Sequence, residues 1–101
     1  MGRFDGRVAL ITGAASGIGR ATAIRMATDG ASIVGFDRDT GGLTSVAAEI
    51  ANAGGAMTTV AGDVSIRAEC IAAVDVAVSA HGRLDILANV AGVTWAEHVA
   101  D

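Results

Sequence analysis

A short apolar run leading into a glycine-rich turn decides the fold of this chain, and it reads Val8-Ala9-Leu10-Ile11-Thr12-Gly13-Ala14-Ala15-Ser16-Gly17-Ile18-Gly19. A continuous apolar run of this length is typical of a strand buried on both faces of a parallel sheet. The segment after the turn, residues 16–29, is rich in Ala, Ile, Met and Arg, lacks Pro and stops at Gly30, which predicts a helix. The turn therefore joins a buried strand to a helix.

The alternation of strand and helix continues along the rest of the chain. Further strands are predicted at residues 32–36, 57–61 and 85–89. Two more helices are predicted from apolar residues at helical spacing, Leu43, Val46, Ala47 and Ile50 in one, and Ile71, Val74 and Val78 in the other. Ser65 is expected to cap the second of these helices. This order predicts an α/β fold with a parallel sheet and right-handed crossovers.

Size and composition limit the classes of protein to which this chain can belong. With 101 residues, 51% of them hydrophobic and only 18% charged, the chain predicts one folded domain rather than a disordered segment. Its net charge of −4 and scattered Arg residues argue against a nucleic-acid partner. It contains no apolar run of the ~18 residues that a membrane span needs. A single cysteine, Cys70, and the absence of a signal peptide predict a cytoplasmic location.

The glycine-rich turn has the features of a site for a dinucleotide. A pyrophosphate must come close to the backbone, and side chains would block that approach, so Gly13, Gly17 and Gly19 predict such a contact. At the start of the helix, free N–H groups and the helix dipole favour an anion, and Ser16 and Ile18 belong to the same turn. Ile18 should place its side chain against the sheet or the cofactor. The alternative is a structural turn that binds no ligand.

An acid at the end of the second predicted strand supports the dinucleotide interpretation. Asp37 follows Gly19 at close to the ~20-residue offset at which a carboxylate meets the hydroxyls of the adenosine ribose. A 2′-phosphate there would face like-charge repulsion, so Asp37 predicts NAD, with NADP as the less favoured cofactor. Arg38, the next residue, could instead attract a phosphate, or it could face solvent or stack on adenine.

The glycine spacing and three further motifs resemble the short-chain dehydrogenase/reductase family. The turn reads Thr-Gly-x-x-x-Gly-x-Gly, and Asp63-Val64 follows the third strand, where that family contacts adenine. Asn89-Val90-Ala91-Gly92 is similar to the family's Asn-Asn-Ala-Gly, with Val90 in place of the second Asn, and Gly82-Arg83-Leu84-Asp85 is also typical. The resemblance covers residues 5 to about 93. Asp63 could alternatively only close its own loop.

The resemblance implies a fold, a cofactor site and an activity. The fold is a partial, Rossmann-like, doubly wound parallel sheet with strand order 3-2-1-4, formed by residues 1–101 as one truncated domain. Residues 93–101 are expected to be a poorly ordered stub. The implied cofactor-binding residues, beyond those of the turn and Asp37, are Arg38, Asp63, Val64, Asn89, Ala91 and Gly92. The implied parent is a homo-oligomer that transfers hydride between NAD and a small alcohol or carbonyl substrate, and it has no nucleic-acid or membrane partner.

No residue of this chain matches the catalytic machinery that the resemblance implies. The family uses a Tyr-x-x-x-Lys motif and a Ser, in which the Lys lowers the pKa of the Tyr, and this chain contains neither Tyr nor Lys. Cys70, His81 and His98 lack the spacing of a metal site or of a catalytic nucleophile. The chain alone is therefore expected to be inactive. A stand-alone NAD-binding module and a methyltransferase-like domain remain as alternatives.

Overall fold

The computed structural model describes residues 2–90. Its elements alternate along the chain: β1 (Val8–Thr12), α1 (Gly17–Thr28), β2 (Ser32–Asp37), α2 (Thr40–Asn52), β3 (Met57–Ala61), α3 (Arg67–His81) and β4 (Ile86–Asn89). The predicted alternation is confirmed, and each predicted strand lies within one residue of the observed one. The expected stub at residues 93–101 lies outside the described residues.

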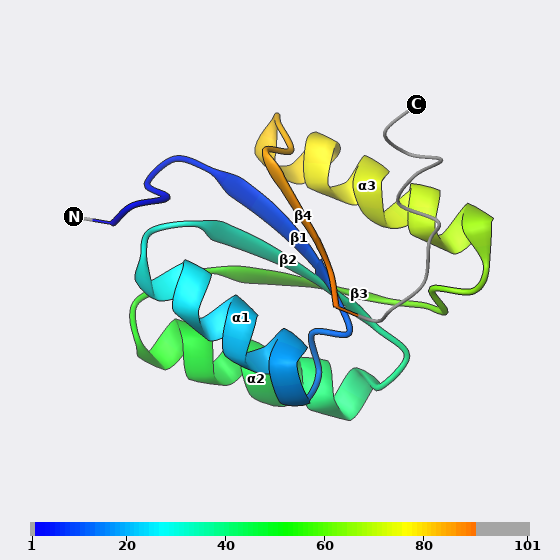
Figure 1. The fold of residues 1–101 in the computed structure, drawn as a ribbon, viewed down its shortest axis with the longest axis horizontal. Coiled ribbons are helices and arrows are strands. Elements are labelled where there is room, and N and C mark those ends of the chain that lie inside the picture. Colours follow the sequence, from blue (N-terminus) through cyan, green and yellow to red (C-terminus); the bar gives the residue numbers. More distant parts are fainter. Residues whose placement is uncertain (1, 91–101) are drawn as a thin grey trace.

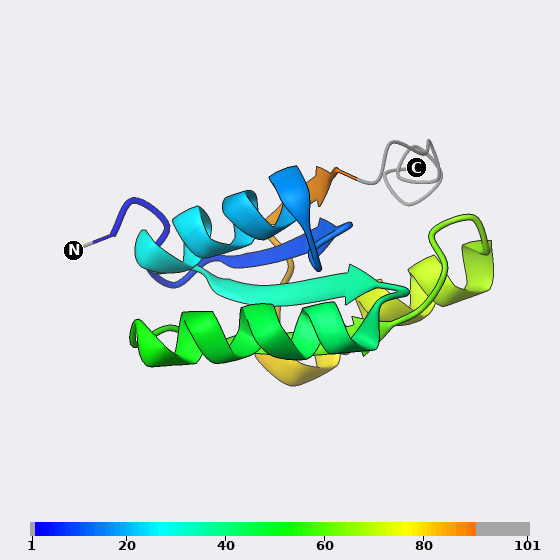
Figure 2. The same cartoon turned by 90° about the horizontal axis from the view of Figure 1, so that it is seen from below.

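The four strands form one parallel sheet in the order β3-β2-β1-β4, as predicted. In the centre of the sheet, Leu10 of β1 is in register with Val34 of β2 on one side and with Leu87 of β4 on the other. Helices α1 and α2 cover one face of the sheet and α3 lies against the other (Figure 1). Seen from below, α1 and α2 run side by side along the sheet (Figure 2).

Each face of the sheet has its own apolar core because successive strand residues point to opposite faces. Ala9, Ile11 and Ile33 pack with residues of α1 and α2. On the opposite face, Leu10 and Phe36 belong to the cluster that contains the buried side of α3. This two-sided burial explains why β1 reads as an uninterrupted apolar run.

The predicted apolar face of α3 is only partly correct: Val74 packs against the core on this side of the sheet, but the other two residues do not. Ile71 and Val78 are 43% and 48% exposed, and the residues that bury completely against the sheet are Cys70, Ala73 and Ala77. Small side chains face the sheet here because large ones, such as that of Phe36, already fill the space from the strand side. The spacing of the large apolar residues therefore predicted a face of the helix that lies beside the one that is fully buried.

The predicted cap of α3 is also wrong. The helix begins at Arg67, its N-cap position is occupied by Ile66, and no side chain accepts a hydrogen bond there. Ser65 lies one residue too early, and its hydroxyl donates to Oδ1 of Asp63 at 2.7 Å. The Ser65 side chain thus forms a hydrogen bond within a local turn instead of capping the helix.

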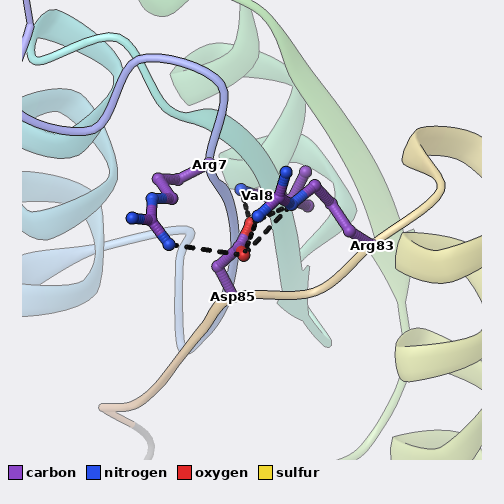
Figure 3. A network of polar contacts seen from close by, with 4 residues as sticks. All are labelled: Arg7, Val8, Arg83 and Asp85. Carbon is purple, nitrogen blue, oxygen red and sulfur yellow. Dashed lines mark hydrogen bonds and ion pairs between the residues drawn. The ribbon is translucent and has the colours of Figure 1, made fainter.

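One carboxylate joins the amino-terminal ends of β1 and β4. Asp85 accepts a hydrogen bond from the backbone N–H of Val8 at 2.8 Å and a bidentate pair from Arg83, with Nε to Oδ2 at 2.8 Å and Nη2 to Oδ1 at 2.7 Å. Arg7 adds an ion pair at 3.7 Å, and Figure 3 shows the three partner residues converging on the Asp85 carboxylate. The network lies at the opposite end of the sheet from the glycine-rich turn and has a structural role.

Candidate functional site

The predicted site residues gather at one edge of the sheet. Because all four strands are parallel, the turn after β1, Asp37 at the end of β2, Asp63 after β3 and Asn89 at the end of β4 all lie at the carboxyl ends of the strands. The crossover from β1 leads to β2 on one side, and β4 lies on the other. Ligands of open α/β sheets bind at such a point, where the strand order reverses.

The turn after β1 depends on two glycines with different constraints. Gly17, the first residue of α1, has a φ of 58°, a left-handed conformation that side chains other than glycine rarely adopt. Gly19 is buried, and a Cβ at this position would overlap the carbonyl oxygen of Gly13. The first turn of α1 therefore lies directly on the backbone of the strand-to-helix turn.

The start of α1 offers backbone N–H groups to an anion. Ser16 occupies the N-cap position, but its side chain makes no capping hydrogen bond, and the first turn of the helix contains no acidic residue. In α2, by contrast, the side chain of Asp39 caps the helix by accepting from the N–H of Gly42 at 2.9 Å. An anion at the start of α1 would accept hydrogen bonds from the first backbone N–H groups of that helix. In α2 the Asp39 side chain accepts such a bond.

Ile18 points away from the sheet. Its side chain is 75% exposed, so one of its two expected positions, against the sheet, is wrong. The position against a cofactor remains a prediction.

Asp37 is held directly against the glycine-rich turn. Its Oδ2 accepts a hydrogen bond from the backbone N–H of Ala15 at 3.0 Å, and its Oδ1 accepts one from the backbone N–H of Asp39, also at 3.0 Å. These two bonds fix the carboxylate beside the turn without neutralising its charge. Sequence offset alone placed Asp37 in the site, but it gave no indication of the contact with Ala15.

Arg38 and Asp63 form an ion pair between the loops that follow β2 and β3. Nη1 of Arg38 lies 3.6 Å from Oδ2 of Asp63, and the Arg38 side chain is 76% exposed. The hydroxyl and backbone N–H of Ser65 hold the pKa of the Asp63 carboxyl below its ordinary value, and the charge of Arg38 acts in the same direction, while partial burial opposes them. These neighbours therefore favour the charged form of Asp63.

The loop that contains Asp63 and Val64 is tied to the first turn of α3. Glu69 accepts a hydrogen bond from the backbone N–H of Asp63 at 2.7 Å, and Sγ of Cys70 donates to the carbonyl oxygen of Val64 at 3.2 Å. Burial raises the pKa of the Cys70 thiol, and the Glu69 and Asp63 carboxylates add to that shift. Cys70 is a packed residue, as expected, and it also orients the loop.

Thr12 and Asn89 connect the carboxyl ends of β1 and β4. The Thr12 side chain is fully buried, and its hydroxyl donates to Oδ1 of Asn89 at 3.1 Å. Thr12 belongs to the turn motif but was not among the predicted site residues. A buried hydroxyl at the last position of a central strand is the signal that would have identified it.

Ala91 and Gly92, two of the predicted site residues, lie outside the described residues. Within residues 2–90, no group of three or more His, Cys, Asp or Glu side chains could hold a metal ion. Over the same range, none of the helices combines the length and the apolar character needed to cross a membrane.

The sequence model of the short chain dehydrogenase family matches residues 7–101, which is nearly the whole chain. The chain belongs to the short-chain dehydrogenase/reductase family. This membership confirms the resemblance on which the fold and the cofactor site were predicted. The observed strand order, β3-β2-β1-β4, is the one that the resemblance predicted.

Similar members of the family are dehydrogenases and oxidoreductases. A D-threitol dehydrogenase of Mycolicibacterium smegmatis is 47% identical over 91 residues, which cover 90% of this chain and 35% of that protein. A crystal structure of a 7α-hydroxysteroid dehydrogenase with NADH and 7-oxo glycochenodeoxycholic acid matches with a TM-score of 0.82 at 41% identity, over 84% of this chain and 33% of the other. A metagenomic short-chain oxidoreductase in complex with NADP matches with a TM-score of 0.79 at 39% identity, over 83% and 38%. The chain thus spans about a third of the length of these relatives.

Proposed function

We propose that this chain is the coenzyme-binding part of an NAD-dependent short-chain dehydrogenase/reductase. The observation that carries the proposal is the geometry of one turn, in which the uncapped start of α1, the close approach at Gly19 and the carboxylate of Asp37 lie side by side. The N–H groups suit the pyrophosphate, and Asp37 suits the hydroxyls of the adenosine ribose. The residues present therefore fit a dinucleotide.

The remaining residues of the proposed site would surround the adenine and the middle of the dinucleotide. Asp63 and Val64 stand on a loop that Glu69 and Cys70 hold in place, next to the end of β2. Asn89, with Ala91 and Gly92 after it, would line the side of the site at β4. Gly13, Ser16, Gly17 and Ile18 complete the set around the turn. Each of these assignments follows from position at the carboxyl edge of the sheet and from membership of the family.

We infer a preference for NAD over NADP from the charge of Asp37. A 2′-phosphate next to this carboxylate would cost about 4 kcal/mol at ~4 Å and an effective dielectric constant of about 20. Solvent screening reduces that cost to roughly 1–3 kcal/mol, which corresponds to about 5- to 150-fold in affinity. Solved relatives include complexes with NADH and with NADP, so the preference rests on Asp37 and not on the family.

The proposed activity of the complete enzyme is hydride transfer involving an alcohol or carbonyl substrate. When bound, the nicotinamide would donate or accept the hydride, and the residues of this chain would bind and orient the dinucleotide. Because the chain has no Tyr and no Lys, the 101 residues alone would show no turnover. We also propose that the complete enzyme is a cytoplasmic homo-oligomer.

Calorimetric titration of the 101-residue chain with NAD and NADP tests the cofactor assignment. NAD should bind more tightly than NADP, and Asp37→Asn should reduce that difference about 5-fold or more, because it removes the repelling charge. Asp75→Asn, on the exposed side of α3, removes an equal charge elsewhere and should leave the difference unchanged. Equal affinities in the unsubstituted chain would contradict the preference, and binding of neither dinucleotide would contradict the proposed function.

A further inference from the structure

We propose that Asp63 is a specificity-determining residue that lowers the affinity for NADP by engaging Arg38. The inference rests on the proposed function. It adds a second residue, besides Asp37, that discriminates between NAD and NADP. Asp37 would repel a 2′-phosphate, and Asp63 would occupy Arg38, an adjacent cation that could attract it.

Arg38 is a cation well placed to meet a 2′-phosphate. It directly follows Asp37, the last residue of β2, whose carboxylate would bind the ribose hydroxyls. An exposed guanidinium next to that position is well suited to bind phosphate. In this structure its Nη1 lies instead 3.6 Å from Oδ2 of Asp63.

Asp63 is a fixed partner rather than a mobile surface carboxylate. Its Oδ1 accepts hydrogen bonds from the backbone N–H of Ser65 at 2.9 Å and from the Ser65 hydroxyl at 2.7 Å. Its own backbone N–H donates to Glu69 at 2.7 Å. One carboxylate oxygen is thereby held by the loop, while the other faces Arg38. Only the Arg38 side chain has to be ordered to form the pair, which reduces its entropic cost.

The pair therefore affects the two dinucleotides differently. A 2′-phosphate has to compete with Asp63 for the Arg38 guanidinium, whereas the free 2′-hydroxyl of NAD makes no such demand. Breaking an exposed ion pair of this kind should reduce NADP affinity about two- to fivefold. Asp63 thus acts as a positioning residue for Arg38.

A double-mutant cycle with Asp63→Asn and Arg38→Gln on the 101-residue chain tests the proposal. The dissociation constants of NAD and NADP are measured for all four proteins by calorimetry, and the readout is the ratio of the two constants. Any adenine contact that Asp63 makes is common to both dinucleotides and cancels in this ratio. Asp63→Asn should shift the ratio toward NADP about two- to fivefold more in the Arg38 background than in the Arg38→Gln background.

A second variant examines how Asp63 is held. Ser65→Ala removes the hydroxyl that binds Oδ1 and keeps the carboxylate charge, so it should shift the ratio in the same direction by a smaller factor. This shift should also disappear when Arg38 is replaced by Gln. The variant further guards against a general effect of charge removal.

The outcomes separate the inference from the function on which it rests. NAD binding with a ratio that Asp63→Asn leaves unchanged, or changes equally in both Arg38 backgrounds, would overturn the inference and leave the proposed function intact. If the unsubstituted chain bound neither dinucleotide, both would fall.

Discussion

At the scale of single residues, some features of the candidate site could be predicted from the sequence and some contacts could not. The positions of Gly13, Gly17, Gly19 and Asp37 at one edge of the sheet could be predicted, because they depend on local backbone conformation and on a fixed offset along the chain. The bond from Ala15 to Asp37 and the pair of Arg38 with Asp63 could not be predicted. They depend on side-chain rotamers and on how close two loops come in space.

The close approach at Gly19 makes a prediction with an internal control. Gly19→Ala should destabilise the fold by about 1–3 kcal/mol, because the added Cβ overlaps the Gly13 carbonyl oxygen and forces the turn apart. Gly41→Ala, in an exposed position of α2 with only an ordinary contact to Asp39, should stabilise by up to about 1 kcal/mol. Urea unfolding of both variants measures the difference, and a Gly19→Ala protein as stable as the parent would contradict the geometry.

The lowered pKa of Asp85 predicts how acid changes the free energy of unfolding. Its hydrogen bonds from Arg83, and then the one from the backbone N–H of Val8, hold the pKa of the Asp85 carboxyl below the ordinary value of 3.8. Since the folded pKa is the lower one, this contribution to stability is present above about pH 3.8 and is lost as the pH falls through the folded pKa. The stability difference between the parent and Asp85→Asn should therefore shrink on acidification below pH 3.8.

Urea unfolding of both proteins at a series of pH values between neutrality and about pH 2.5 measures that difference. Asp75→Asn, an exposed substitution on α3, controls for the loss of one charge. A difference between parent and Asp85→Asn that stays constant through this range would show that the ionised carboxylate is not what joins β1 to β4.

At the scale of elements, the strands and the buried face of α2 were easier to predict than the buried face of α3. A buried parallel strand needs only a continuous apolar run, and β1 provides one. The buried face of α3 was only partly predicted, because packing against the sheet selects small residues, such as Ala73 and Ala77. Hydrophobic spacing does not report the space left by the opposing strand residues.

The start of α3 lacks a side-chain cap, and one substitution there should stabilise the helix. Ile66 occupies the N-cap position with its side chain partly exposed and without a capping bond. Ile66→Ser should stabilise the protein by about 0.5–2 kcal/mol, because a hydroxyl there can accept a hydrogen bond from a backbone N–H of the first turn. Ile66→Ala removes the same apolar side chain without adding an acceptor, so it should not reproduce the gain in thermal or urea unfolding. Equal effects of the two substitutions would rule out capping as the cause.

At the scale of the whole molecule, the order of the strands and the position of the site followed from the family resemblance. The exposure of individual surfaces did not follow from it. All four residues of β4 are only half-buried, and Ile71 and Val78 project from α3. Such apolar surface favours association between molecules.

The 101-residue chain should therefore self-associate as its concentration rises, which sedimentation velocity can measure. Replacing Ile71 and Val78 together with Gln should weaken the association. Ile18→Gln removes an even more exposed side chain from a different part of the molecule and should have little effect. A cooperative thermal transition of a monomer that is independent of concentration would contradict this expectation.

The central position of β1 also has a consequence for the chain as it leaves the ribosome. Its first neighbour, β2, ends at Asp37, but its second neighbour, β4, ends only at Asn89. At a synthesis rate of about 5–20 residues per second, roughly 3–10 seconds separate the two. During that interval the strand that will occupy the middle of the finished sheet has an unpaired side, and nascent chains are most prone to mispairing there.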